Sequence, residues 1–174
     1  MAFSVAGLST LGVKASYAVE SVAGTKPSTG WLQLERLTSI GGLSLSTEQI
    51  DVTAIEDVFK RYAAGQQDTG GNIEIGFNVT PEVIAQIEKL FTASNTAKSA
   101  SKATWLQISH DDMNRAFFIK IECPRAIPVP ETGSNSAWQI TVNFIVSSYE
   151  GLANKVTFAQ DSTINADGTI SGGN

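Results

Sequence analysis

Residues 73–91 read IEIGFNVTPEVIAQIEKLF and change their hydrophobic period halfway along. In residues 73–79, apolar side chains alternate with polar or small ones, which predicts a β-strand with one buried face. The apolar side chains that follow recur at helical spacing, Thr80 can serve as the N-cap, and Pro81 suits the first helical position. We therefore predict a strand followed directly by a short amphipathic helix over residues 81–92.

Strand signals dominate on both sides of this stretch. Residues 138–146, WQITVNFIV, alternate in the same way, and a polar cluster at 110–114 separates two candidate strands, which predicts a hairpin. The other expected strands cover residues 13–19, 31–37, 43–46, 49–55, 105–109 and 116–123. We expect a mainly β fold, a β-sandwich or partly open barrel, in which the single helix covers the open side or end.

The length of 174 residues fits one domain. We place that β domain at residues 1–160. The polar segment 161–174 has low hydrophobicity and Asp167-Gly168 turn chemistry, which predicts a frayed tail or an added short hairpin. Residues 1–10 lack the basic start of a signal peptide, and no apolar run approaches the ~18 residues of a membrane span, so we expect no membrane association.

Charge and cysteine usage exclude several classes of protein. The chain has 12 Lys and Arg against 17 Asp and Glu, a net charge of −5, which disfavours gripping nucleic-acid phosphates. Cys123 is the single cysteine and His110 the single histidine. We therefore expect neither a disulfide framework nor a zinc site.

No catalytic motif fits the sequence. Ser109, His110 and Asp111 are adjacent, but the members of a catalytic triad converge from separated positions. The acidic residues at 111–112 lack the spacing of a calcium loop, and Cys123 is interpreted as a small core side chain. The Gly-Gly pairs at 41–42 and 70–71 fit no phosphate-binding pattern. We expect no enzyme, no cofactor and no metal, and a function that resides in surfaces.

One long connection stands out as a candidate contact surface. Residues 56–71 exceed the length of an ordinary hairpin loop, yet they carry apolar and aromatic side chains that suit docking to a partner. The basic pair at 60–61 lies beside acidic residues, which is typical of a solvated face. The candidate docking residues are Val58, Phe59, Lys60, Arg61 and Tyr62.

Residues 31–92 resemble the major tail tube proteins of long-tailed bacteriophages. The resemblance is carried by TSIGGLSLSTEQIDVTAIED, residues 38–57, followed by VFKRYAAGQQDTGGNIEIGFNVTP, residues 58–81. In that family a strand leads into an Ile-Gly-Gly turn, a Ser-rich strand ends in Ile-Asp-Val-Thr, and an aromatic, glycine-containing loop precedes an alternating strand. Here these elements are residues 40–42, 50–53, 62–65 and 71–79.

The resemblance implies a structural virion protein that assembles into stacked hexameric rings. The rings form a conduit through which DNA passes without specific binding during ejection. The implied partners are further copies of the chain, the tape-measure protein, and the tail-tip and tail-terminator proteins. The implied location is the virion tail, and the host cytoplasm during assembly. Within this resemblance, residues 58–62 are the candidate loop for stacking between rings.

Two alternatives remain open from the sequence. A tube protein of a contractile tail or a type VI-like injection system would share the architecture, and a neighbouring sheath gene would distinguish it. A β-sandwich glycan-binding module would also be rich in Ser, Thr and aromatic residues, but it should bind a glycan as a monomer.

Overall fold

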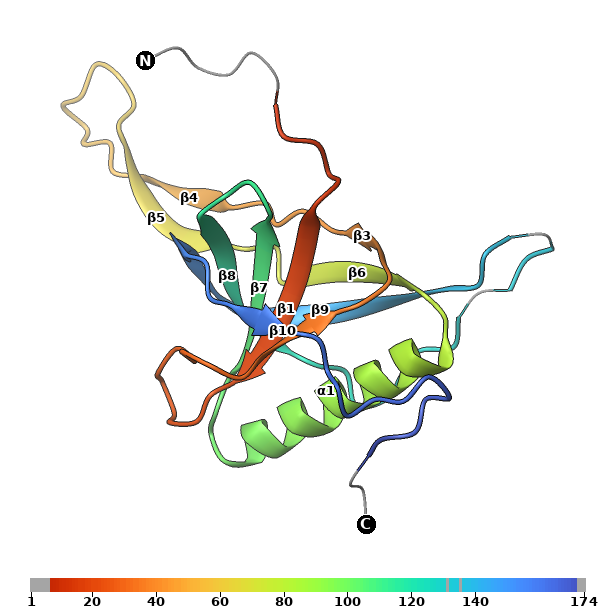
Figure 1. The fold of residues 1–174 in the computed structure, drawn as a ribbon. Helices are drawn as coiled ribbons and strands as arrows, with labels where there is room; N and C mark the ends of the chain where they lie inside the picture. Colours follow the sequence, from red (N-terminus) through yellow and green to blue (C-terminus); the bar gives the residue numbers. More distant parts are fainter. Residues whose placement is uncertain (1–6, 131, 135, 172–174) are drawn as a thin grey trace.

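The computed structural model describes residues 7–130, 132–134 and 136–171. The fold is mainly β, with one helix, a curled half-barrel sheet and a small second sheet, which confirms the predicted fold class (Figure 1). The elements in chain order are β1 (Val13–Val19), β2 (Trp31–Leu34), β3 (Leu37–Ile40), β4 (Ser46–Asp51), β5 (Tyr62–Asp68), β6 (Asn72–Asn78), α1 (Pro81–Ser99), β7 (Thr104–His110), β8 (Arg115–Glu122), β9 (Gln139–Asn154) and β10 (Phe158–Ala159).

The large sheet has eight strands in the order β10-β2-β1-β7-β8-β9-β6-β3, and β4 and β5 form a separate two-stranded sheet. Every pairing in the large sheet is antiparallel except the short parallel contact between β10 and β2. The two edges are thus formed by β3 and β10. The predicted hairpin at 105–109 and 116–123 is confirmed as β7 and β8.

The curl of the sheet comes from the sixteen-residue strand β9. Its first half, to Ile145, pairs with β6, and its second half pairs with β8. The register with β8 shifts between Phe118 and Ile119 and again between Lys120 and Ile121. Such irregularities bend a strand and increase its twist, so one long strand joins two differently directed halves of the sheet.

Helix α1 covers the concave side of this sheet (Figure 1) and packs against the larger of the two cores. The Thr80 hydroxyl accepts a hydrogen bond from the Val83 amide at 3.3 Å, which confirms the predicted N-cap. Buried Ile87 and Leu90 join the strand residues of the main core, and Phe91 meets Phe144 edge to face at 6.3 Å. Among the described residues, no helix is both long enough and apolar enough to span a membrane.

The helix extends to Ser99, beyond the predicted end at residue 92. The buried stripe continues through Ser94 and Ala97, whose small side chains escape a count of large apolar residues. The helix ends where Ser101 takes a φ of 56°, and the Lys102 amide then bonds to the Ala97 carbonyl at 2.9 Å. Small buried residues therefore explain the seven additional positions.

A smaller core lies on the opposite face of the sheet. Because successive strand residues face opposite sides, Leu106 joins the main core and Trp105 the second. Trp31 and Phe118 pack edge to face here with ring centroids 5.7 Å apart. Strand β7 is consequently buried on both faces along most of its length, whereas β8 leaves Arg115 and Phe117 exposed.

Several predicted strand boundaries were wrong. The expected strand over 31–37 is two strands, because Arg36 takes a φ of 55° between β2 and β3. The expected strand at 43–46 is absent, and the one at 49–55 is replaced by β4, which starts earlier and ends at Asp51. The connection at 56–71, predicted as a loop, contains strand β5.

The described part of the C-terminal segment, residues 161–171, lies against α1 (Figure 1). The Asp161 carboxylate pairs with the Lys89 ammonium of the helix. Ile164 and Ile170 form a β-bridge around a turn, and a Cβ at Gly168 would approach the Pro81 carbonyl oxygen to 2.7 Å. Residues 172–174 of the predicted tail, and residues 1–6, lie outside the described residues.

Candidate functional site

The β4–β5 hairpin projects from the body of the molecule (Figure 1). Its strands pair only with each other, from Ser46↔Asp68 to Asp51↔Tyr62. Every residue of β4 is exposed, and in β5 only Gly65 is partly buried. An isolated two-stranded hairpin is marginal in water, so this element needs support from outside the large sheet.

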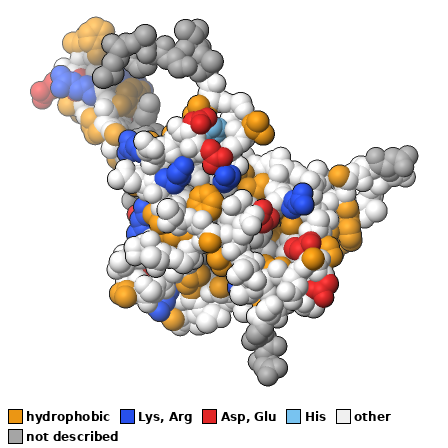
Figure 2. Space-filling view, in the orientation of Figure 1, with side chains coloured by type: hydrophobic (Ala, Val, Ile, Leu, Met, Phe, Trp, Pro, Cys, Tyr) orange, Lys and Arg blue, Asp and Glu red, His pale blue; other side chains and the backbone are white. Residues whose placement is uncertain are grey.

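The connection between the two strands, residues 52–61, exposes large apolar side chains at its tip. Ile55, Val58 and Phe59 are each more than 80% exposed, and Tyr62 at the start of β5 is 55% exposed. Figure 2 shows hydrophobic side chains on this projection, beside charged ones. Clustered exposed apolar side chains mark an interaction surface. The hairpin tip, defined as residues 52–62, is the first candidate site.

Polar contacts at the base give the hairpin tip a defined shape. The Asp51 carboxylate accepts a hydrogen bond of 2.9 Å from the Thr53 amide, and the Thr53 hydroxyl accepts one of 3.0 Å from the Arg61 amide. The Asp57 carboxylate accepts from the Ala54 amide at 3.0 Å. The bonds from the Thr53 hydroxyl and amide lower the pKa of the Asp51 carboxyl. The acidic side chains here are thus engaged locally.

Three of the four charged side chains of the hairpin tip pair within the hairpin, and Glu56 is in no ion pair among the described residues. The Arg61 guanidinium lies 3.2 Å from the Asp57 carboxylate, and the Lys60 ammonium lies 3.9 Å from that of Asp51. The structure therefore divides the five predicted docking residues into two kinds. Val58, Phe59 and Tyr62 offer free apolar surface, whereas the two basic residues neutralise neighbouring carboxylates.

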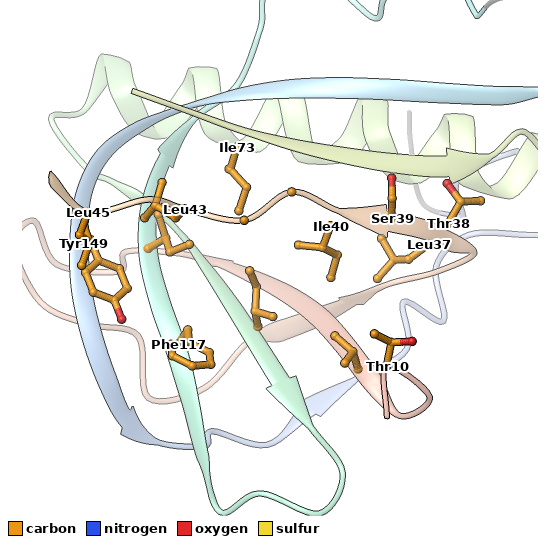
Figure 3. A pocket seen from close by; sticks show the side chains of 15 residues that line it. Thr10, Leu37, Thr38, Ser39, Ile40, Leu43, Leu45, Ile73, Phe117 and Tyr149 are labelled. Carbon is orange, nitrogen blue, oxygen red and sulfur yellow. The ribbon is translucent and has the colours of Figure 1, made fainter. Parts of the chain in front are cut away.

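A groove at the open side of the curled sheet is the second candidate site, and the sequence did not predict it. It has a cavity volume of about 700 Å³, and none of the lining residues that the structure describes is charged. Figure 3 shows its side chains converging from β3, β6 and β8 and from the segment between β3 and β4. The apolar lining includes Leu37, Ile40, Leu43, Ile73, Ile108 and Phe117.

The rim of the groove leaves apolar side chains in water. Leu45, immediately before β4, is 47% exposed, and Phe117 on β8 is 41% exposed. The floor is formed by core residues, since Ile73 and Ile119 are both buried. The groove is a continuation of the core that the sheet does not close over.

A polar strip follows the face of β6 and β9 that points away from α1. The inward residues Ile75 and Val142 are buried in the main core, so the intervening side chains face outward. Those of Asn72 and Glu74 on β6, and of Gln139, Thr141 and Asn143 on β9, are exposed. Among the polar side chains of this strip, Glu74 carries the charge, which is negative.

His110 is held by backbone groups. Its Nε2 donates to the Ser9 and Leu11 carbonyl oxygens, both at 3.0 Å, and its Nδ1 accepts from the Asp112 amide at 3.1 Å. Asp111 pairs with Lys14 at 2.8 Å. Ser109 precedes His110 within β7, where successive side chains diverge. The structure gives His110 the role of fastening residues 9–11 to the end of β7.

Cys123 lies partly buried after β8. Burial raises the pKa of its thiol to about 11, and the Ser94 hydroxyl hydrogen-bonds to it. A thiol of this kind is protonated near neutral pH and is a poor nucleophile. Among the described residues, no group of three or more metal-ligating side chains comes together.

The chain matches no protein-family model and no curated protein sequence. The features of the described chain that can form contacts are the hairpin tip, the groove and the polar strip.

Proposed function

We propose that this protein is a structural subunit of a bacteriophage tail tube. The observation that carries the proposal is the projecting β4–β5 hairpin with its exposed apolar tip. This hairpin occupies the stretch in which the sequence resembles tail tube proteins. In a monomer the hairpin adds no buried core to the fold, whereas a subunit that is surrounded by copies of itself can bury the hairpin against them.

The sheet edges support assembly into rings. Strands β3 and β10 are the two edges of the large sheet. Edge strands present unpaired backbone groups that can hydrogen-bond to another chain. Contacts between two different edges are heterologous and close into a ring when the rotation per subunit fits. In this proposal the ring is hexameric, as in the family that the sequence resembles.

The polar strip on β6 and β9 suits the wall of a DNA conduit. Its amide and hydroxyl side chains are accompanied by the carboxylate of Glu74, and the whole chain has a net charge of −5. Negative surface repels phosphates, whereas a basic wall would bind DNA in a salt-dependent manner. In the proposal, DNA therefore passes along this strip without specific binding.

The assembled tube would contact the tape-measure protein inside it, and the tail-tip and tail-terminator proteins at its ends. Its place is the virion tail, after assembly in the host cytoplasm.

Sedimentation and negative-stain electron microscopy of the full chain test the proposal. Increasing protein concentration, or adding isolated tail tips as initiators, should convert monomers into rings or tubes. A protein that remains monomeric at every concentration and on tail tips would contradict a tube function.

A further inference from the structure

The groove beside β3 presents apolar surface that the subunit itself leaves in water. None of the described residues that line it is charged, and the rim residues Leu45 and Phe117 are nearly half exposed. Removing apolar surface from water is favourable. A groove of this size, open and uncharged, suits apolar side chains from another segment.

The hairpin tip matches the groove in chemistry. Its outermost large side chains, Ile55, Val58 and Phe59, are apolar and almost fully exposed. Three of its four charged side chains are already paired within the hairpin, Arg61 with Asp57 and Lys60 with Asp51, whereas Glu56 has no ion pair among the described residues. Burying an unpaired charge is costly, so docking of the tip requires that Glu56 stays in water at the rim of the groove while the apolar side chains enter it.

The tip and the groove of one copy are kept apart by the chain itself. Leu45 lines the groove, and β4 begins at the next residue and extends for six residues. At about 3.3 Å per residue, such a strand carries the tip roughly 20 Å from its starting point. Figure 1 shows the hairpin directed away from the body. While the hairpin keeps this direction, the tip does not reach the groove of its own chain.

We propose that the groove binds the hairpin tip of a second copy of this chain, with Val58 and Phe59 as the anchoring side chains. This inference rests on the proposed function in one respect, because it takes the hairpin to be a contact between subunits. It adds the receiving surface. Since tip and groove are different patches of the molecule, the contact leaves a free tip and a free groove on the pair, and further copies can join.

Disulfide cross-linking between two populations tests the contact. Both populations carry Cys123→Ala; one also carries Glu56→Cys, an exposed tip position that leaves the anchoring side chains in place, and the other Leu45→Cys, each with a tag of different mass. After mixing and oxidation, we expect a covalent heterodimer whose linked peptides join positions 56 and 45. The control mixes Glu56→Cys with Thr96→Cys, which lies on the exposed side of α1.

The expected yield is roughly tenfold or more above that control, because docked groups reach effective concentrations of about a millimolar. A yield equal to the control would overturn the inference. So would an intramolecular disulfide in a Leu8→Cys, Leu45→Cys double variant that persists on dilution, because the N-terminal segment would then fill the groove.

Electron microscopy of the cross-linked samples separates this inference from the proposed function. Tubes that form without the 56-to-45 link would contradict the groove contact and leave the tube function standing. A strong link in dimers that never extend to rings or tubes would support the groove contact and contradict the tube.

Discussion

The carboxylate of Glu20 accepts a hydrogen bond of 2.9 Å from the indole nitrogen of Trp105. Its second oxygen accepts from the amides of Gly24 at 2.8 Å and Ala103 at 3.0 Å. The Glu20 side chain thereby joins the loop after β1, the segment after α1, and the smaller core. Burial alone raises the pKa of this carboxyl, but the three donated hydrogen bonds outweigh it and lower the pKa below its ordinary value.

Glu20→Gln should destabilise the protein by about 2 kcal/mol at neutral pH, because an NH₂ group then replaces one of two carboxylate oxygens that both face N–H donors. A lowered pKa stabilises the fold above the ordinary value of 4.5, and this contribution is lost as the pH falls through the folded-state pKa. The difference in the free energy of unfolding between the variant and the unsubstituted protein should therefore become smaller at acidic pH. Urea unfolding from pH 7 to pH 3 measures it. Glu88→Gln, on the exposed side of α1, is the control and should change little.

Lys89→Met should destabilise the protein by about 3 kcal/mol, because it leaves a buried carboxylate without its cation. The Asp161 side chain is 4% exposed. Burial raises the pKa of the Asp161 carboxyl, but bonds from Lys89 and Thr163 lower it overall. Without the cation, the pKa should rise and the loss of stability should be greatest above the ordinary value of 3.8. Adding Asp161→Asn should restore part of the lost stability, because the uncompensated carboxylate is then absent. Denaturant unfolding of the double variant measures this recovery, and no recovery would contradict the role of the ion pair.

Gly168→Ala should detach the C-terminal segment from α1. At Gly168 the φ is +80°, and a Cβ there would lie 2.7 Å from the Pro81 carbonyl oxygen. Gly30 is the matched control, since its φ is +78° and a Cβ would meet nothing within 4 Å. We expect Gly30→Ala to cost about 1 kcal/mol through backbone strain alone. Limited proteolysis should cut residues 164–171 faster in the Gly168 variant only; equal cutting in both would remove the proposed close contact.

Phe59→Ser with Tyr62→Ser should leave the monomer folded and reduce polymer yield more than tenfold, since interface anchors contribute about 2 kcal/mol each. Both side chains are exposed in the monomer, so the free energy of unfolding should change by less than about 0.5 kcal/mol. Pelleting and thermal unfolding measure the two quantities. Val129→Ser is the matched control, being 93% exposed outside the hairpin. Unchanged yield in the double variant would remove the hairpin tip from the assembly contacts.

Local patterns predicted the elements that bury one face. The alternation at 73–79 became β6, and Thr80 with Pro81 marked the start of α1. Strand β5 was not predicted, because neither of its faces is buried and its sequence therefore shows no alternation of apolar and polar residues. The positive φ of Arg36 divided a predicted strand, and a non-glycine residue gives little sequence signal for such a conformation.

The exposed apolar side chains of the hairpin tip could be identified from the sequence as a docking candidate, but the groove could not. Its lining comes from six strands and the segment between β3 and β4. Those residues meet only because β9 pairs with β6 along one half and with β8 along the other. The curl depends on the register between strands that are far apart in the sequence, and no short sequence motif indicates that register.

Cryo-electron microscopy of the assembled full-length protein tests the proposed tube function most directly. The account predicts stacked hexameric rings around a channel whose wall carries Glu74 and Asn143, with the hairpin tip of each subunit buried against another copy. Particles that remain monomeric, alone and on tail tips, would contradict the account. So would an assembly that has no continuous channel.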